Sequence, residues 1–355
     1  MRIVVDALCA EYGGIRTYVE QTLAQWHLLH PDDDVHVVLR AGSTLATPGL
    51  TRHELAVGRP DMVQRPWAQM TSMHRLIARL DPDAVLATAP TTDVRRTAAP
   101  LAIVILDLRF EVLPHEFTAA RRLMRRVSYG RSYHLAAGIL AISQRSLDDL
   151  HRLHPRTVKK PSAVSYLGAD HVQAWPVPSR SGPAIAFAHH TNKNPELLVD
   201  AWAHLHREGY DRPLLFLGVN NDLRERLTRL IEQRGLGGSV RLSPFLDDHE
   251  FQRTIASAGL VAFPSSFEGF GLPIVEGMAL GKPVVIGPDP GCIEIAGGHG
   301  ALANEWTAEA IAKAVLEGEA MTSQELEAAR AHAATFTWRQ TVEQTRELLQ
   351  RISRR

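Results

Sequence analysis

The sequence has few features of a secreted or membrane-spanning protein. Only two of its 355 residues are cysteines, Cys9 and Cys292, and their positions fit neither a metal-ligand spacing nor a disulfide framework. The longest apolar run, residues 101–106, is far shorter than the ~20 residues that a spanning helix needs. The amino-terminal segment turns polar after a few residues, which is typical of a first strand and not of a signal peptide. We therefore expect a cytoplasmic protein.

An excess of charge of either sign is also absent. Lys and Arg together number 39, as do Asp and Glu. A nucleic-acid-binding protein usually has a basic excess, so we expect no nucleic-acid partner. The 17 histidines form no HExxH motif, and Asp32, Asp33 and Asp34 follow a proline in a predicted solvated turn. We therefore expect no bound metal.

Short apolar runs alternate with helical patterns along most of the chain. Continuous Val, Ile and Leu runs are typical of strands in a parallel sheet that is covered on both faces. In the first half they lie at residues 3–5, 35–39, 84–87, 101–106 and 138–142, and in the second half at residues 184–188, 213–218, 239–243, 260–265 and 282–287. The clearest helical pattern begins at Pro195, with Asn194 as its expected N-cap.

These patterns predict an α/β protein of two Rossmann-like doubly wound domains, residues 1–170 and 184–336. A stretch rich in proline and serine, residues 171–183, is the predicted linker. A charged helix at residues 337–353 ends the chain. Ligands of open parallel sheets bind beyond the carboxyl ends of the strands, so we expect the site in an interdomain cleft.

Residues 265–283 carry the densest motif, SSFEGFGLPIVEGMALGKP. The pattern predicts a strand end, a glycine loop, and a helix that begins at Pro273. Glycines in such a loop let backbone N–H groups approach a ligand. Glu268 lies in the loop and Glu276 in the predicted first turn of the helix. Two carboxylates around a glycine loop are acceptors for sugar hydroxyls, although each one alone is also explained as a helix-end or turn carboxylate.

This segment resembles the signature of family-4 glycosyltransferases, which have the GT-B fold and retain anomeric configuration. The resemblance implies that Glu276 binds the donor ribose, and that Glu268 contacts the donor hexose with the backbone of Gly269, Phe270 and Gly271, next to Leu272. It also implies a metal-independent enzyme without a cofactor, in which a nucleoside-diphosphate sugar is the co-substrate.

Further segments extend the resemblance over nearly the whole chain. Residues 12–15 resemble a glycine loop that approaches the donor phosphates, with Gly13 and Gly14 as the matching residues; a plain tight turn is the alternative. Residues 142–150 resemble the start of a helix whose N-cap is Ser143. Residues 164–170 resemble the strand before an interdomain hinge, and residues 336–345 resemble a terminal helix that packs back onto the first domain.

The phosphate-binding segment both matches the family pattern and departs from it. Lys193 matches a lysine that neutralises the diphosphate leaving group; a solvated loop lysine is the alternative. Many members carry an arginine about five positions earlier, where this chain has Ala188. His190 is a candidate replacement, because a histidine can donate to phosphate, and a structural role is the alternative.

The acceptor side departs further. Where the family often has a His-Asp pair, this chain has Leu106 and Asp107. Asp107 is a candidate to bind or orient the acceptor hydroxyl, and a cap or turn role is the alternative.

Five arginines crowd a predicted helix between residues 117 and 135: Arg121, Arg122, Arg125, Arg126 and Arg131. They are explained by a solvated face, by weak peripheral contact with an anionic membrane, or by a phosphorylated acceptor. Because no apolar face accompanies them, a soluble acceptor is favoured.

The sequence thus predicts a retaining hexosyltransferase that acts on a hydroxyl-bearing small molecule or glycan, with Glu268, Lys193 and Asp107 as the catalytic candidates. The alternatives are a GT-B sugar-nucleotide epimerase and a sugar-nucleotide-binding protein that has lost transfer. A nicotinamide dehydrogenase is disfavoured, because no GxGxxG motif follows an early strand.

Overall fold

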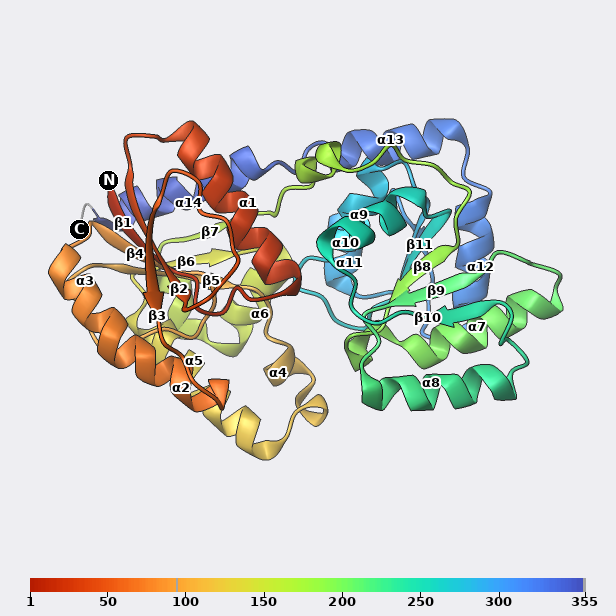
Figure 1. Cartoon of the computed structure of the whole chain (residues 1–355), viewed down its shortest axis with the longest axis horizontal. Coiled ribbons are helices and arrows are strands. Elements are labelled where there is room, and N and C mark those ends of the chain that lie inside the picture. The colour runs from red at the N-terminus through yellow and green to blue at the C-terminus, as the bar shows by residue number, and fades with distance from the viewer. Residues whose placement is uncertain (94, 354–355) are drawn as a thin grey trace. The chain divides into compact units, whose positions relative to one another are not determined.

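The computed structural model describes residues 1–93 and 95–353 and divides the chain into two compact units. The first unit contains Met1–Gly168 and the terminal segment that begins at Thr337, and the second contains Ala169–Phe336. Each unit is built around its own parallel sheet (Figure 1). No helix in the described ranges combines the length and the hydropathy that a bilayer crossing requires.

The first unit has a seven-stranded sheet in the order β3-β2-β1-β4-β5-β6-β7, with every pair of neighbours parallel. Val4 of β1 belongs to the same buried hydrophobic cluster as Met73, Ile77 and Tyr133. The elements are β1 (Arg2–Asp6), α1 (Gly13–Leu29), β2 (Asp34–Arg40), β3 (Thr51–Leu55), α2 (Asp61–Ala68), η1 (Gln69–Met73), α3 (His74–Leu80), β4 (Ala84–Ala87), β5 (Leu101–Ile105), α4 (Arg109–Val112), η2 (Pro114–Glu116), α5 (Ala119–Leu135), β6 (Gly138–Ala141), α6 (Gln144–Leu153), η3 (Pro155–Lys159), β7 (Ser162–Val164) and α14 (Trp338–Ser353).

The second unit has a six-stranded parallel sheet in the order β10-β9-β8-β11-β12-β13. Its elements are η4 (Asp170–Ala174), β8 (Ala184–Phe187), η5 (Thr191–Lys193), α7 (Pro195–Arg207), β9 (Leu214–Leu217), α8 (Asn221–Gln233), β10 (Val240–Leu242), α9 (Asp248–Ser257), β11 (Leu260–Phe263), α10 (Leu272–Ala279), β12 (Val284–Ile286), α11 (Pro290–Ala296), β13 (Ala301–Leu302), α12 (Ala308–Glu319) and α13 (Ser323–Ala333). Numbered by their order in the chain, the strands of the second sheet run 3-2-1-4-5-6, the doubly wound order, and those of the first run 3-2-1-4-5-6-7, the same order with one further edge strand. The predicted fold class is confirmed.

Every apolar run that predicts a strand forms one, while three edge strands, β3, β7 and β13, lie outside those runs. β3 reads TRHEL and is only partly buried, because an edge strand has a partner on one side alone and needs no continuous apolar run. β13 has two residues, too few to give a pattern. All but the first residue of the short helix η4 lies in the segment predicted as a linker.

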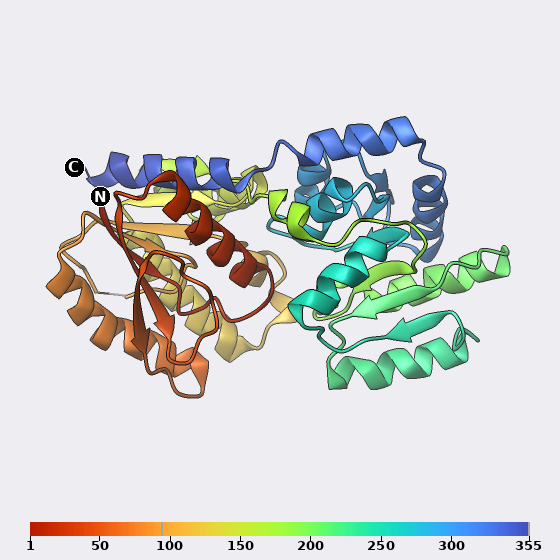
Figure 2. The same cartoon turned by 45° about the horizontal axis from the view of Figure 1, so that its top comes forward.

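The terminal helix α14 packs against α1 and runs beside β4, β5, β6 and β7 of the first unit (Figure 2). Asp33 anchors it. Its carboxylate accepts from Arg346 Nε at 2.7 Å and Nη2 at 3.1 Å, from the amino terminus at 2.7 Å and from Trp26 Nε1 at 3.1 Å. The solvated turn predicted for Asp33 is therefore wrong, since three donors converge on this buried side chain, whereas Asp32 beside it is exposed.

Desolvation raises the pKa of Asp33, but the bonds from Arg346, the amino terminus and Trp26 outweigh it and lower the pKa from 3.8 to about 2. A lowered folded-state pKa stabilises the fold at pH values above the unfolded pKa, and this contribution is lost as the pH falls through about 2. The size of the shift corresponds to about 2 kcal/mol.

We predict that Asp33→Asn lowers the free energy of unfolding by about 2 kcal/mol at neutral pH, because three donors lose a charged acceptor. The difference from the unsubstituted chain should shrink as the pH falls from about 4 to about 2. Urea unfolding across this pH range measures it, with Asp32→Asn as the matched control. A loss that does not vary with pH would contradict the assignment.

Candidate functional site

The candidate site lies at the carboxyl ends of β8, β11 and β12 in the second unit. Each of these strands is followed by a turn and then by the amino-terminal end of a helix: α7, α10 and α11 respectively. Because the three strands are parallel neighbours, these helix starts meet at one edge of the sheet. Helix amino termini offer N–H groups and a positive dipole end, so this edge suits an anionic ligand.

The glycine loop between β11 and α10 has the conformation that its composition demands. Gly271 has φ +93°, a left-handed value that disfavours other residues, and α10 begins at the next residue, Leu272. The expectation that Glu276 lies in the first turn is therefore wrong. Since the helix begins before Pro273, Glu276 is its fifth residue, and no acidic residue lies in the first turn.

Lys193 and Glu268 form a largely buried ion pair. Lys193 Nζ lies 2.5 Å from Glu268 Oε1, and Asn192 Nδ2 donates to the same oxygen at 3.1 Å. Lys193 Nζ also lies 4.3 Å from the centroid of the Phe263 ring, a favourable cation–π distance. Lys193 is thus not a solvated loop lysine, because only 8% of its side chain is exposed.

Backbone and side-chain bonds join the loop that carries Lys193 to the loop that carries Glu268. Ser266 N donates to Asn192 O at 2.8 Å, and Asn192 Nδ2 donates to Phe267 O at 2.9 Å. Asn194 precedes α7 as predicted, but it has φ +52° and its side chain makes no cap bond. Its Nδ2 donates instead to Pro264 O at 2.8 Å, because the left-handed backbone turns the amide towards β11.

Glu276 is buried and bound to a histidine that the sequence places in the predicted linker. His171 Nε2 lies 3.1 Å from Glu276 Oε1, and both side chains are about 5% exposed. The His171 ring stacks edge-on against Trp175 at 5.4 Å. His171 was missed because it falls in the predicted linker, directly after residues 164–170, and its partner Glu276 lies far along the chain. The pair holds one oxygen of Glu276 in place.

Asp289 is a second residue that the sequence reasoning missed. It caps α11 through Cys292 N at 3.1 Å, and the same oxygen accepts from Glu268 N at 3.2 Å. A Cβ on Gly291 would lie 2.4 Å from Glu268 O, so the glycine permits this close approach. The Asp-Pro-Gly sequence, an N-cap followed by a helix-starting proline, is the signal that could have identified Asp289.

Ala188 and His190, the residues that bear on the missing arginine of the phosphate-binding segment, differ in their exposure to solvent. Ala188 is fully buried in the core of the second unit, so its position faces helices of that core and not the solvent. His190 is exposed, and its ring lies 4.9 Å from that of His189.

The candidates of the first unit lie at the carboxyl ends of β1 and β5. Gly13 and Gly14 are the first two residues of α1, and Gly13 has φ +66°, so they start a helix and are not a separate loop. Asp107 Oδ1 accepts from Arg109 N at 2.9 Å. The turn role considered for Asp107 is therefore present. Ser143 caps α6 through Ser146 N, as predicted.

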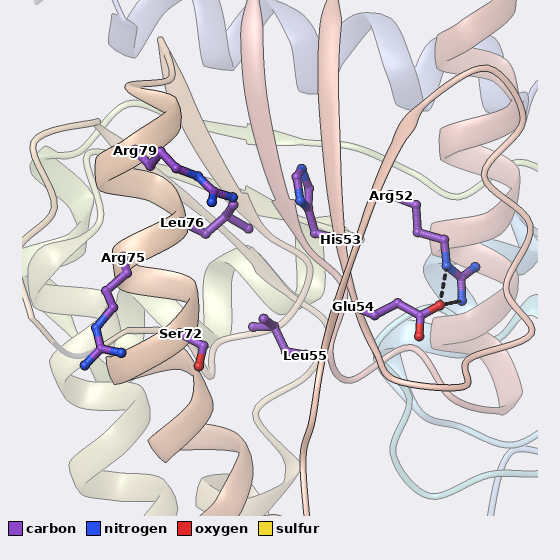
Figure 3. A pocket seen from close by; sticks show the side chains of 8 residues that line it. All are labelled: Arg52, His53, Glu54, Leu55, Ser72, Arg75, Leu76 and Arg79. Atoms are coloured by element: carbon purple, nitrogen blue, oxygen red, sulfur yellow. Dashed lines mark hydrogen bonds and ion pairs between the residues drawn. The ribbon is translucent and has the colours of Figure 1, made fainter.

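A surface hollow of about 450 Å³ lies elsewhere in the first unit, between β3 and α3 (Figure 3). Arg79 and His53 line it, while Arg52 pairs with Glu54. None of the predicted site residues lines it. Within residues 1–93 and 95–353, no group of three His, Cys, Asp or Glu side chains is arranged to hold a metal ion.

We predict that Gly271→Ala destabilises the second unit by roughly 1–3 kcal/mol. Alanine at this position would have to adopt a left-handed backbone conformation, and its Cβ would lie 3.0 Å from Ile274 Cδ1. Urea unfolding measures the loss. Gly238→Ala is the matched control, because nothing lies within 4 Å of its Cβ position, and equal stabilities of the two variants would contradict the prediction.

Comparison with known proteins identifies the second unit. Residues 186–335 match the family model for group 1 glycosyltransferases. This segment contains Lys193, Glu268 and Glu276.

Sequence relatives match part of the chain. The O-antigen chain mannosyltransferase B of Escherichia coli is 32% identical over 43% of this chain and 41% of its own length. The alpha-D-kanosaminyltransferase of Streptomyces kanamyceticus is 26% identical over 59% of this chain and 58% of its own. The chain thus spans about half the length of these relatives.

A solved structure matches the whole fold. The Anabaena HepE protein in complex with UDP-glucose has a TM-score of 0.74 and 20% identity, over 99% of this chain and all of that one. At this identity the likeness shows the fold alone. Residues 186–335 thus match the family that the glycine-loop signature predicts, and the two parallel α/β sheets have the GT-B fold.

Proposed function

We propose that this protein transfers a hexosyl group from a nucleoside-diphosphate sugar to a hydroxyl-bearing acceptor, with retention of anomeric configuration. The observation that carries the proposal is the Lys193–Glu268 pair at a sheet edge where helix amino termini meet, inside the segment that matches the family. The second unit is then the donor domain, and the first unit is the acceptor domain.

In the donor domain, carboxylates bind sugar hydroxyls. Glu276, oriented by His171, is proposed to accept from the ribose. The bonds from Lys193 and Asn192 both go to Oε1 of Glu268. Its second oxygen, Oε2, is proposed to accept a hydrogen bond from the hexose. The backbone from Gly269 through Phe270 to Leu272 borders the same sugar, while the Phe270 ring itself packs on Phe336 at 5.7 Å.

The leaving group is proposed to be stabilised by fixed positive charge. As the bond between the anomeric carbon and the diphosphate breaks, negative charge develops on the phosphate oxygens. Lys193 and the amino-terminal end of α10, which lacks a side-chain cap, supply donors that need no rearrangement. His190 is the exposed candidate for a further phosphate contact.

The acceptor oxygen bonds to the anomeric carbon on the face that the diphosphate leaves, which gives retention. Its proton passes to the departing phosphate. In the acceptor domain, Asp107 is proposed to orient the acceptor hydroxyl through the oxygen that does not bind Arg109 N. The helix start at Gly13 and Gly14 is proposed as a contact for the donor phosphates.

The sugars named for the relatives support a hexose donor. One relative is a mannosyltransferase and another a kanosaminyltransferase, and the HepE structure contains UDP-glucose. We propose a donor of this class, without choosing the base or the sugar.

The test is an incubation of the full chain with nucleotide sugars and a panel of acceptors, with the release of nucleoside diphosphate measured. Release that depends on an acceptor, with a glycosylated product, supports the proposal. Isomerised donor without an acceptor would replace it with an epimerase, and binding without turnover would replace it with a sugar-nucleotide-binding protein.

We predict that Glu276→Gln weakens nucleotide binding about tenfold, since one charged acceptor for the ribose is worth about 1.5 kcal/mol. The glutamine oxygen still accepts from His171, so the fold should persist. Calorimetric titration measures the change, with Glu232→Ala, on the exposed side of α8, as the control. Unchanged affinity would remove the ribose assignment.

We predict that Lys193→Ala lowers kcat about 10²- to 10³-fold, because the diphosphate loses a preorganised cation. The transfer assay at saturating donor measures it. Lys313→Ala removes an exposed lysine of the same unit and should leave kcat unchanged. A kcat for Lys193→Ala close to that of the unsubstituted chain would contradict the leaving-group role.

A further inference from the structure

Three of the five arginines of α5, Arg121, Arg125 and Arg126, form two sets on different sides of the helix. The helix carries five arginines and no acidic residue. Arg126 is exposed and shares the outer side of the helix with Leu123 and Val127, which are each 65% exposed. Arg121 and Arg125 lie on the other side, against aromatic rings. The two sets therefore face different surroundings.

Arg121 and Arg125 form a cluster with Arg109 of α4 around one phenyl ring. The guanidinium carbons of Arg109, Arg121 and Arg125 lie 5.4, 5.7 and 5.1 Å from the centroid of the Phe117 ring. Arg125 also lies 5.7 Å from the centroid of the Tyr129 ring. A guanidinium that lies over an aromatic ring can still donate hydrogen bonds through its N–H groups. We call these three residues the arginine cluster.

The positive charge of the arginine cluster is only partly balanced. Glu116 Oε2 lies 3.4 Å from Arg109 Nε, and no other carboxylate among the described residues lies within ion-pair distance of Arg121 or Arg125. Burial first, and then the neighbouring charges of Arg125 and Arg109, lower the pKa of Arg121. Three like charges held together in this way repel one another, and an anion would relieve that repulsion.

The arginine cluster lies at the functional edge of the first unit. Arg109 follows the end of β5, and its backbone N–H binds Asp107, the proposed acceptor residue. Tyr12, directly before the helix start at Gly13, is among the groups that affect the pKa of Arg121. Both neighbours lie beyond the carboxyl ends of strands, where ligands of parallel sheets bind. Arg121 remains exposed, so a ligand can reach it.

We propose that the arginine cluster binds a phosphate group of the acceptor, so that the acceptor of the proposed transfer is a phosphorylated molecule. Arginine forks match the geometry of phosphate oxygens and bind them in bidentate fashion. This proposal rests on the proposed function and specifies its acceptor class. The phosphate belongs either to a free sugar phosphate or to a lipid headgroup.

Binding is tested with inorganic phosphate as the probe. The full chain is melted in phosphate and in chloride at matched ionic strength, with saturating nucleoside diphosphate present to occupy the donor domain. Phosphate should stabilise the unsubstituted chain, and Arg121→Gln combined with Arg125→Lys should weaken its binding at least tenfold. The exposed Arg126→Ala should bind phosphate normally. Equal phosphate binding in all three proteins, or an equal loss in Arg126→Ala, would overturn the proposal.

Arg125 packs on three rings, so its replacement alone could disturb the fold. The exposed Arg121→Gln is therefore also measured singly, and it should weaken phosphate binding severalfold. Nucleotide binding is titrated in the same variants and should not change. If the nucleotide fails to bind even the unsubstituted chain, the proposed function fails, whereas the phosphate measurement still decides the anion site.

Two further arms identify the source of the phosphate. The transfer assay compares sugar phosphates with the matching neutral sugars, and sedimentation compares phosphatidic acid vesicles with phosphatidylcholine vesicles. A preference in either arm that is lost in Arg121→Gln and kept in Arg126→Ala supports the proposal and names the source. Faster transfer to neutral sugars, with vesicle binding lost only in Arg126→Ala, would overturn it.

Discussion

The ion pair between Lys193 and Glu268 is the interaction on which the candidate site depends. Removing two charges from water is costly, and their attraction offsets the cost only where further hydrogen bonds and good geometry help. Here Asn192 donates to the shared carboxylate oxygen, and the Phe263 ring lies under the ammonium group. Breaking the pair would leave a buried charge without its partner, so the pair holds the loops after β8 and β11 in one arrangement. The cation proposed for the diphosphate and the carboxylate proposed for the hexose are thus fixed relative to each other before a ligand arrives.

Backbone conformation supports that arrangement. Asn194 and Gly271 both have left-handed φ values, and each stands directly before a helix of the site. These two residues set the points where α7 and α10 begin, and therefore where their N–H groups are presented. In the first unit, by contrast, the arginine cluster lies around the Phe117 ring, and Glu116 balances its positive charge only in part. The second unit thus has a paired cation and carboxylate, proposed for the diphosphate and the hexose, and the first unit has excess positive charge that suits an anion.

The sequence predicts the parts of this structure that depend on regular patterns. Buried strands need continuous apolar runs, so β1 and β11 were predicted, whereas the polar edge strand β3 was not. The spacing of Glu268 and Glu276 was visible, but the exact helix start was not, because it depends on the backbone of Gly271. Partners far apart in the chain leave no local pattern. Asp33 is therefore predicted to lie in a solvated turn, because the sequence does not show that Arg346 lies beside it. His171 is predicted to be part of a linker for the same reason, since the sequence does not show that it contacts Glu276.

The central claim is that the carboxy-terminal unit binds a nucleoside-diphosphate sugar, and a thermal-shift panel tests it most directly. A ligand that binds the folded chain raises its melting temperature in proportion to the logarithm of its concentration over Kd. The account predicts that nucleoside diphosphates and nucleotide sugars of one base raise the melting temperature, with a smaller rise for the matching monophosphate. No rise with any base, or equal rises with monophosphates and diphosphates of every base, would contradict it.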